Sequence, residues 1–169
     1  MTVAVRLAGP ADRDAVARLI EAMDRHYESP MPGAGEIGPA VETWLSGEGT
    51  DGRIALAFDG APSADNAVGI AIFAVLHPGV ALTGLLFLKD VFVAETARGL
   101  GAGEAIMRFL ARYCVENGIG RIDLQTERDN EGARRFYGRL GGDLQEMKIG
   151  YRFGPGALQR LAAQTPGEE

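Results

Sequence analysis

The sequence predicts an α/β fold of the α+β kind, with a mixed, mostly antiparallel sheet of six to seven strands and helices on both faces. Short apolar runs alternate with amphipathic segments along the chain, and residues 81–93 are apolar on both alternating faces. A strand with two apolar faces is covered on both sides, which places it in the middle of a sheet. At 169 residues the chain is long enough for one full core, so we expect a single domain over residues 1–169.

The first half of the chain predicts two helices. Residues 2–7 form a first strand, and Pro10 with Asp12 then opens a helix. Its apolar residues recur at helical spacing: Val16, Leu19, Ile20, Met23 and Tyr27. Residues 28–52 are rich in Gly and Pro, but Val41, Trp44 and Leu45 indicate a second, short helix between two loops.

Three strands follow, over residues 53–58, 67–76 and 81–93, and we expect them to form an antiparallel meander. Residues 67–88 carry no Asp, Glu, Lys or Arg, and their length alone fits a membrane span. His77, Pro78 and Gly79 interrupt the run in the middle. Because Pro and Gly mark turns, two strands joined by a turn is the better interpretation.

The second half predicts a helix after Gly103, a strand over residues 121–125, another helix, a strand over residues 144–153 and a short helix over residues 156–163. The buried stripe of the first helix is Ala105, Ile106, Phe109, Leu110 and Tyr113. The inner face of the second helix is Ala133, Phe136, Tyr137 and Leu140. Residues 165–169 are expected to fray.

Composition limits the classes of partner and compartment. Lys and Arg number 17 against 23 Asp and Glu, which argues against a nucleic-acid partner and leaves room for a cationic small substrate. One cysteine, Cys114, excludes an internal disulfide, and two histidines offer no recognisable metal cluster. The first residues lack the features of a secretory signal, so we expect a cytoplasmic protein with no membrane partner.

A glycine-rich segment, Arg98 to Gly103, joins the two-faced strand to the following helix. The first N–H groups of a helix lack partners within it and carry partial positive charge, so a diphosphate can bind there through backbone alone. Two other interpretations stand beside this one. The glycines serve only a tight turn, or they belong to a dinucleotide site, although Glu104 replaces the expected third glycine and a meander precedes it.

Together with a second segment from Asn130 to Gly141, this turn resembles the GCN5-related N-acetyltransferases (GNAT). Arg98-Gly99-Leu100-Gly101-Ala102-Gly103 and then Asn130, Ala133, Phe136-Tyr137 and Leu140-Gly141 match in order and spacing. The strand before the turn, from Leu86 to Val93, is most similar to the diamine (spermidine/spermine-type) acetyltransferases. One departure is Lys89, where that group has a glutamate.

The resemblance implies acetyl-CoA as co-substrate, without a metal, and assigns roles to residues. The backbone of Val91, Phe92 and Val93 would meet the pantetheine arm, and the amides of Arg98, Gly99, Leu100, Gly101, Ala102 and Gly103 would hold the diphosphate. By its residue type Asn130 is either simply a helix N-cap or, as the resemblance implies, a cap that also bonds the pantetheine. Arg139 would pair with the 3′-phosphate. Tyr137 would protonate the departing thiolate, although an aromatic at this spacing is otherwise a core residue.

The expected reaction is direct attack of a primary amine on the thioester, with no covalent enzyme intermediate. An alkylamine of pKa about 10.4 must first lose a proton, which costs about 4 kcal/mol near neutral pH. Asp90 is the leading candidate to bind the cation or relay this proton, with Glu127 behind it; the alternative is a structural carboxylate neutralised by Lys89. Cys114 and His26 are read as structural or incidental, and His77 as a turn residue.

Other functions remain open at this stage. The chain could be a non-catalytic CoA-binding regulatory domain, or an acetyltransferase that acts on a protein amine. The acceptor could be a small amine such as a polyamine or diamine. A homodimer is expected by analogy with the family alone.

Overall fold

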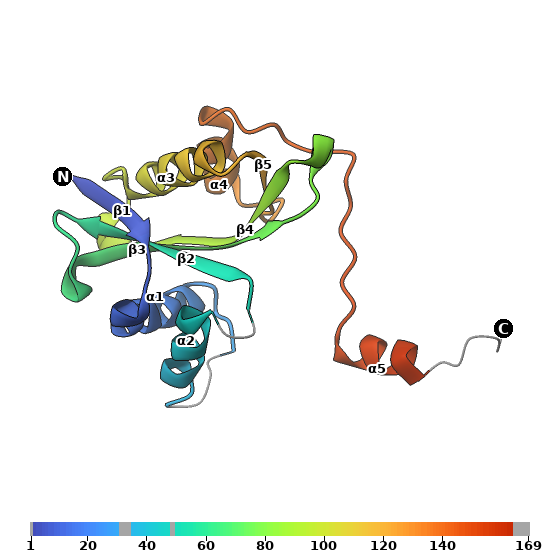
Figure 1. The fold of residues 1–169 in the computed structure, drawn as a ribbon, viewed down its shortest axis with the longest axis horizontal. Coiled ribbons are helices and arrows are strands. Elements are labelled where there is room, and N and C mark those ends of the chain that lie inside the picture. Colours follow the sequence, from blue (N-terminus) through green and yellow to red (C-terminus); the bar gives the residue numbers. More distant parts are fainter. Residues whose placement is uncertain (1, 31–34, 48–49, 164–169) are drawn as a thin grey trace. The chain divides into compact units, whose positions relative to one another are not determined.

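The computed structural model describes residues 2–30, 35–47 and 50–163 (Figure 1). The chain divides into two compact units, Met1–Gln125 and Thr126–Glu169, which are described one at a time. The expectation of a single domain stays a prediction.

The first unit contains a five-stranded sheet with the order β1-β2-β3-β4-β5. The strands are β1 (Val3–Leu7), β2 (Gly52–Asp59), β3 (Ala67–Leu76), β4 (Gly84–Val93) and β5 (Ile119–Leu124). Strands β1 to β4 pair antiparallel, and β5 pairs parallel with β4. The predicted meander and the central place of the strand before the glycine turn are confirmed.

The predicted count of six to seven strands is wrong, because the described residues form five. The missing strand is residues 144–153, which are turn and irregular chain in the second unit. The segment has a strand's alternation of side chains, but a strand also needs a hydrogen-bonded neighbour. None of the described strands pairs with it.

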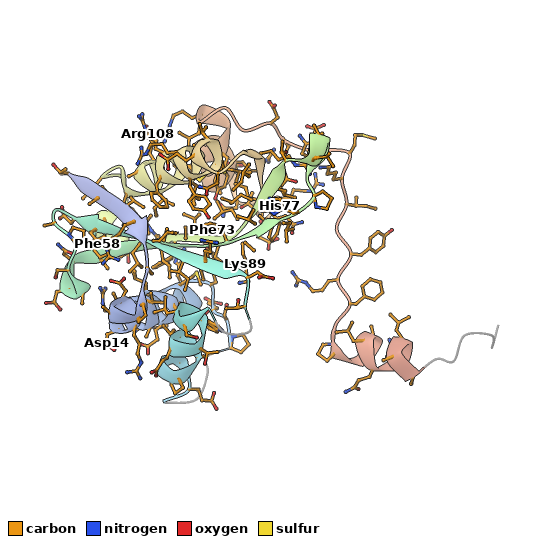
Figure 2. All side chains as sticks on the ribbon, viewed as in Figure 1. Asp14, Phe58, Phe73, His77, Lys89 and Arg108 are labelled. Atoms are coloured by element: carbon orange, nitrogen blue, oxygen red, sulfur yellow. The ribbon has the colours of Figure 1, made fainter. Side chains whose placement is uncertain are left out.

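Helices cover both faces of this sheet, as predicted. On one face lie α1 (Arg13–His26) and α2 (Ile37–Ser46), and on the other lies α3 (Ala102–Glu116) (Figure 1). Phe58 belongs to the core under α1 and Phe73 to the core under α3; both are labelled in Figure 2. The unit is therefore a three-layer arrangement with a separate apolar core on each face of the sheet.

Small residues let α3 approach the sheet closely. Ala55, Ala57 and Ala71 are fully buried on this face, and Ile106 and Leu110 of α3 pack in the same core. Nearby, a Cβ added to Gly69 would lie 3.2 Å from Ile106 Cδ1. The predicted stripe of α3 is confirmed at Ile106 and Leu110, which are completely buried.

An extra residue in β4 changes which side chains face which layer. Asp90 pairs with Ile72 and Leu88 pairs with Phe73, so Lys89 between them is a β-bulge. Leu86 and Leu88 pack in the core under α3, whereas Phe92 packs in the core under α1 and α2. The sequence pattern had placed Phe92 on the face of Leu86 and Leu88; the bulge overturns that assignment, since one extra residue inverts the alternation.

An ion pair joins β1 to the start of α1. The Nη1 and Nη2 atoms of Arg6 donate to Oδ2 and Oδ1 of Asp12 at 2.7 and 2.8 Å, and the amide of Gly9 also donates to Oδ2 at 2.8 Å. The Arg6 hydrogen bonds lower the pKa of the Asp12 carboxyl below its ordinary value, which outweighs the opposing effect of burial. Asp12 is thereby stabilised in its ionised form although it is buried.

The second unit contains α4 (Glu131–Arg139) and α5 (Pro155–Ala163). Both helices were predicted. The predicted inner face of α4 is confirmed for Ala133, Phe136 and Tyr137, which are half-buried. Leu140, the fourth residue predicted for this face, is exposed. The predicted frayed end over residues 165–169 lies outside the described part of the chain.

In the described ranges no helix is long and apolar enough to cross a membrane. Residues 67–88, which had allowed that interpretation by length, form β3, a turn and the start of β4.

Candidate functional site

The edge of β4 beside β5 is open over its last residues. The two strands pair in parallel from Gly84↔Ile119 to Leu88↔Leu124, and among the described residues their pairing ends there. Val91, Phe92 and Val93 pair with β3 on the other side. Their free edge can therefore accept an extended ligand as an additional strand, the mode predicted for the pantetheine arm.

The turn after β4 has the conformation that its glycines allow. Gly99 and Gly101 have φ of +74° and +87°, in the left-handed region that side chains other than glycine rarely adopt. A Cβ at either position would meet no atom within 4 Å, so the space in front of this backbone is open. The turn therefore leaves room for a ligand to approach its main chain.

The turn delivers the chain into α3, whose N-cap is Gly101. Gly101 has no side chain to accept a hydrogen bond, and its carbonyl accepts the first bond of the helix, from Ala105 N at 2.9 Å. The amides of Ala102, Gly103 and Glu104 therefore lack partners in the first turn of the helix. With the positive end of the helix dipole they provide the donors that a diphosphate needs.

Arg98 lies against the end of β4. Its amide donates to Glu95 O at 3.2 Å, and its Nε donates to Val93 O at 3.1 Å. Its guanidinium also lies 5.9 Å from the centre of the Phe92 ring. Arg98 therefore fixes the turn to the strand, and its amide has a backbone partner in this structure.

Asp90 follows the bulge and lies on the face of the sheet that carries α1 and α2. Its side chain is 26% exposed, and Lys89 Nζ lies 2.5 Å from its Oδ2. The contact fits the alternative in which Lys89 neutralises Asp90. It also leaves a partly exposed carboxylate two residues from Phe92, close to the open edge of β4.

His26 also belongs to this region, although the sequence analysis interprets it as structural or incidental. It ends α1, and its ring centre lies 5.9 Å from that of Phe92 and 5.0 Å from that of Tyr27. Phe92 and Asp90 share this face of β4, so His26 lies on the same face of the sheet as the Asp90 carboxylate. No sequence signal identified it, because the contact depends on the change of face at the bulge.

The second unit holds the remaining predicted residues. Asn130 caps α4, with Oδ1 accepting from the amide of Ala133 at 3.0 Å, so its capping role is confirmed. Tyr137 is half-buried, and its ring lies 5.1 Å from that of Phe136. The guanidinium of Arg139 lies 5.8 Å from the centre of the Phe136 ring. Their roles toward the cofactor stay predictions.

A cavity of about 620 Å³ lies elsewhere in the first unit, at the other end of α3. Tyr113 and Asn117 line it together with Arg53, His77 and Trp44. None of the predicted site residues contributes to its wall. The chemistry proposed for the glycine turn therefore does not use this cavity.

Among the described residues, no group of three or more His, Cys, Asp or Glu is placed to hold a metal ion. The first unit has an open edge at the end of β4 and amides without helical partners at the start of α3. Asp90 and His26 lie on the face of the sheet that carries α1 and α2. Such an arrangement can bind a molecule that has both an extended amide chain and a diphosphate.

The sequence model of the Acetyltransferase (GNAT) family matches residues 20–142. Among curated proteins, a mycothiol acetyltransferase of Corynebacterium jeikeium is 42% identical over 62 residues, which cover 37% of this chain and 18% of that protein. The uncharacterized N-acetyltransferase YobR of Bacillus subtilis is 39% identical over 54 residues, 32% of this chain and 22% of its own length. The matched region thus spans less than a quarter of either relative.

Solved structures match over most of the chain. An integron cassette protein from the mobile metagenome of V. cholerae has a TM-score of 0.80 at 27% identity, covering 97% of this chain and 99% of its own. The ribosomal-protein-alanine N-acetyltransferase of Brucella melitensis has a TM-score of 0.71 at 20% identity, covering 90% and 100%. The second likeness is one of fold alone.

Proposed function

Since the chain belongs to the acetyltransferase (GNAT) family, we propose that it transfers the acetyl group of acetyl-CoA to a primary amine of a small molecule. The observation that carries this proposal is the glycine turn at the N-terminus of α3, beside the open edge of β4. The turn supplies donors for a diphosphate and the edge supplies backbone partners for the pantetheine amides. No metal is part of the proposed reaction.

In the proposed mechanism the amine and the thioester bind together, and the neutral nitrogen attacks the thioester carbon. Holding both reactants in one site replaces a bimolecular encounter with an intramolecular step. Asp90 binds the incoming cation or passes its proton to water, and Tyr137 gives a proton to the departing sulfur. Ordinary pKa values of about 10 for tyrosine and about 8.5 for a thiol make this last transfer at most mildly unfavourable.

For the acceptor, we favour a diamine or polyamine. The support is the partly exposed carboxylate of Asp90 and the strand sequence from Leu86 to Val93, which is similar to that of diamine acetyltransferases. A relative is named a mycothiol acetyltransferase, and a structural neighbour is named a ribosomal-protein-alanine N-acetyltransferase. A protein amine is therefore the second candidate acceptor. We place the reaction in the cytoplasm.

Calorimetric titration with CoA and acetyl-CoA tests the cofactor, and NADH is the control ligand. We expect binding of CoA and none of NADH; absence of CoA binding at millimolar concentration would overturn the proposal. Release of free CoA with a panel of diamines, monoamines, anionic amines and peptides then tests the reaction. Binding without turnover on any acceptor would favour the alternative of a non-catalytic CoA-binding domain.

A further inference from the structure

The cavity at the C-terminal end of α3 is formed by the first unit. Its volume is about 620 Å³, which is in the range of ordinary small-molecule sites. Its wall comes from the end of β1, the beginning of β2, the end of β3, the beginning of β5 and the last turns of α2 and α3. All the described wall residues belong to the unit that contains the sheet, so the wall does not depend on residues 126–169.

This cavity lies at the opposite end of the sheet from the glycine turn. Val93, at the open edge of β4, pairs with Gly69 near the start of β3, whereas Val75 near the end of β3 lines the cavity. The strand from Gly69 to Val75 spans about 20 Å. His77, which follows β3 and also lines the cavity, is labelled in Figure 2. A ligand in the cavity therefore lies away from the backbone of the glycine turn.

Arg53 is a cation on the cavity wall without a counter-ion among the described residues. It is exposed at the beginning of β2, and its guanidinium lies 5.9 Å from the centre of the Tyr113 ring. Within the described part of the chain it forms no hydrogen bond and no ion pair. Asp51 also lines the wall but is not paired with Arg53. The N–H donors of the guanidinium are therefore available to an anion in the cavity.

Other wall residues supply a further polar group and apolar surface. Asn117 Nδ2 donates to the carbonyl oxygen of Tyr113 at 2.8 Å, which holds this side chain at the end of α3. The apolar and aromatic groups of the wall include Leu7, Val75, Ile119 and Trp44. Small-molecule sites combine apolar surface with a few polar groups that orient the ligand. A guanidinium beside aliphatic and aromatic groups fits a carboxylate that is attached to an apolar body.

We propose that this cavity is a second ligand site, which binds a small monocarboxylate with an aromatic or aliphatic body. The carboxylate accepts two N–H bonds from Arg53, and the body packs against the apolar groups of the wall. Because like charges repel, Asp51 on the same wall favours a ligand with one negative charge over a dianion. The site is additional to the proposed acetyl transfer and does not depend on it.

Trp44 provides a readout that is specific to the cavity. It is the only tryptophan of the chain and lies on the cavity wall, so its fluorescence reports a ligand bound there. Phenylacetate is the test ligand, and phenylacetamide is the control because it has the same shape without the charge. We expect phenylacetate to change the emission with a dissociation constant below about 1 mM, about tenfold or more tighter than phenylacetamide. Equal affinities, or no change of emission up to about 10 mM phenylacetate, would overturn the proposal.

Two arginine variants test where the carboxylate binds. Arg53→Gln should weaken phenylacetate binding about tenfold or more, because the charge-assisted hydrogen bonds are lost. Arg112→Gln is the matched control, since Arg112 is exposed on α3 beside Tyr113 but is not one of the wall residues. Its phenylacetate affinity should equal that of the wild type. Unchanged binding in Arg53→Gln would overturn the proposal, and the comparison of the two ligands on the wild type does not require that this variant folds.

A titration in the presence of CoA distinguishes the cavity from the cofactor site. The dissociation constant of phenylacetate should stay the same, because CoA is proposed to bind at the other end of the sheet. A dissociation constant that rises in proportion to the CoA concentration would mean competition for one site, which contradicts a second site. Phenylacetate binding by a protein that fails to bind CoA would leave this inference standing and overturn the proposed acetyl transfer.

Discussion

Lys89 Nζ lies 2.5 Å from Oδ2 of Asp90, at the bulge in β4. Lys89 thus forms an ion pair with the carboxylate that we propose as the binding group for the acceptor cation. An exposed ion pair of this kind is worth at most about 1 kcal/mol, so a substrate amine can displace it at modest cost.

We expect Lys89→Gln to lower the KM for diamines about two- to fivefold, because the pair is lost and Asp90 is freed for the substrate. Asp90→Asn should raise that KM by at least the same factor. Steady-state kinetics with a diamine and an uncharged-tail monoamine provide the comparison. Asp65→Asn, an exposed carboxylate in a turn, is the control for charge. Equal KM values for Asp90→Asn and wild type would mean that Asp90 is a structural carboxylate and does not bind the substrate.

Tyr137→Phe should lower kcat by about a hundredfold or more, since a positioned acid contributes about that much. CoA affinity should change less than twofold, because the ring and its contact with Phe136 are kept. Tyr113→Phe is the matched control, as Tyr113 packs against Phe73 and Phe109 in the core under α3. An unaltered kcat in Tyr137→Phe would mean that the residue serves packing alone.

The two ends of α3 offer a paired test of the glycine turn. Gly101 precedes the helix with φ +87° and Gly118 follows it with φ +66°. Alanine at either position should lower the free energy of unfolding by about 1–2 kcal/mol, because a Cβ strains the left-handed backbone conformation. Only Gly101→Ala should also weaken CoA binding, about tenfold, because that backbone faces the diphosphate. Calorimetry and thermal unfolding separate the two effects, and equal CoA affinities would argue against the cradle.

The ion pair of Arg6 and Asp12 predicts a loss of stability in acid. The folded-state pKa of Asp12 is lowered, so its contribution is fully present above the unfolded pKa of about 3.9 and is lost as pH falls through the lower folded value. Asp12→Asn should cost about 2 kcal/mol at pH 7, and the difference from wild type should shrink below about pH 4. Urea unfolding at both pH values measures it. Asp14→Asn, which removes an exposed carboxylate at the start of α1, is the control.

Cys114 should not react with thiol reagents while the protein is folded. The side chain is 6% exposed, and burial raises the pKa of its thiol, so little thiolate forms at neutral pH. A disulfide reagent should therefore modify the native protein much more slowly than the unfolded protein. Rapid modification of the native chain would contradict the packing of this residue under α3. The result also matters for assays that detect free CoA by its thiol.

Much of the fold could be predicted from periodicity and turn residues. The apolar spacing of Ile106 and Leu110 identified α3 and its buried face, and His77 to Gly79 identified the turn between β3 and β4. The capping role of Asn130 also followed from its residue type at the start of a helical pattern. These features depend on residues close together in the sequence, where local chemistry decides the conformation.

Other features could not be predicted because they depend on distant partners. The bulge at Lys89 is defined by pairing with Ile72 and Phe73, and the alternation in β4 alone gives no sign of it. The contact of His26 with Phe92 follows from that bulge and was missed for the same reason. Residues 144–153 have the alternation of a strand but are turn and irregular chain in the structure, because alternation alone does not supply a hydrogen-bonded neighbour.

The bulge at Lys89 also determines how this region tolerates change in length. Replacing Lys89 alters one side chain, whereas deleting it would restore the uninterrupted alternation of β4. Since Leu88 already pairs with Phe73 and Asp90 with Ile72, Asp90 would keep the face of α1 and Val91 the face of α3 after the deletion. The position is therefore permissive both for the identity of its residue and for its absence, and it should appear in related sequences as a variable site that also accommodates a gap.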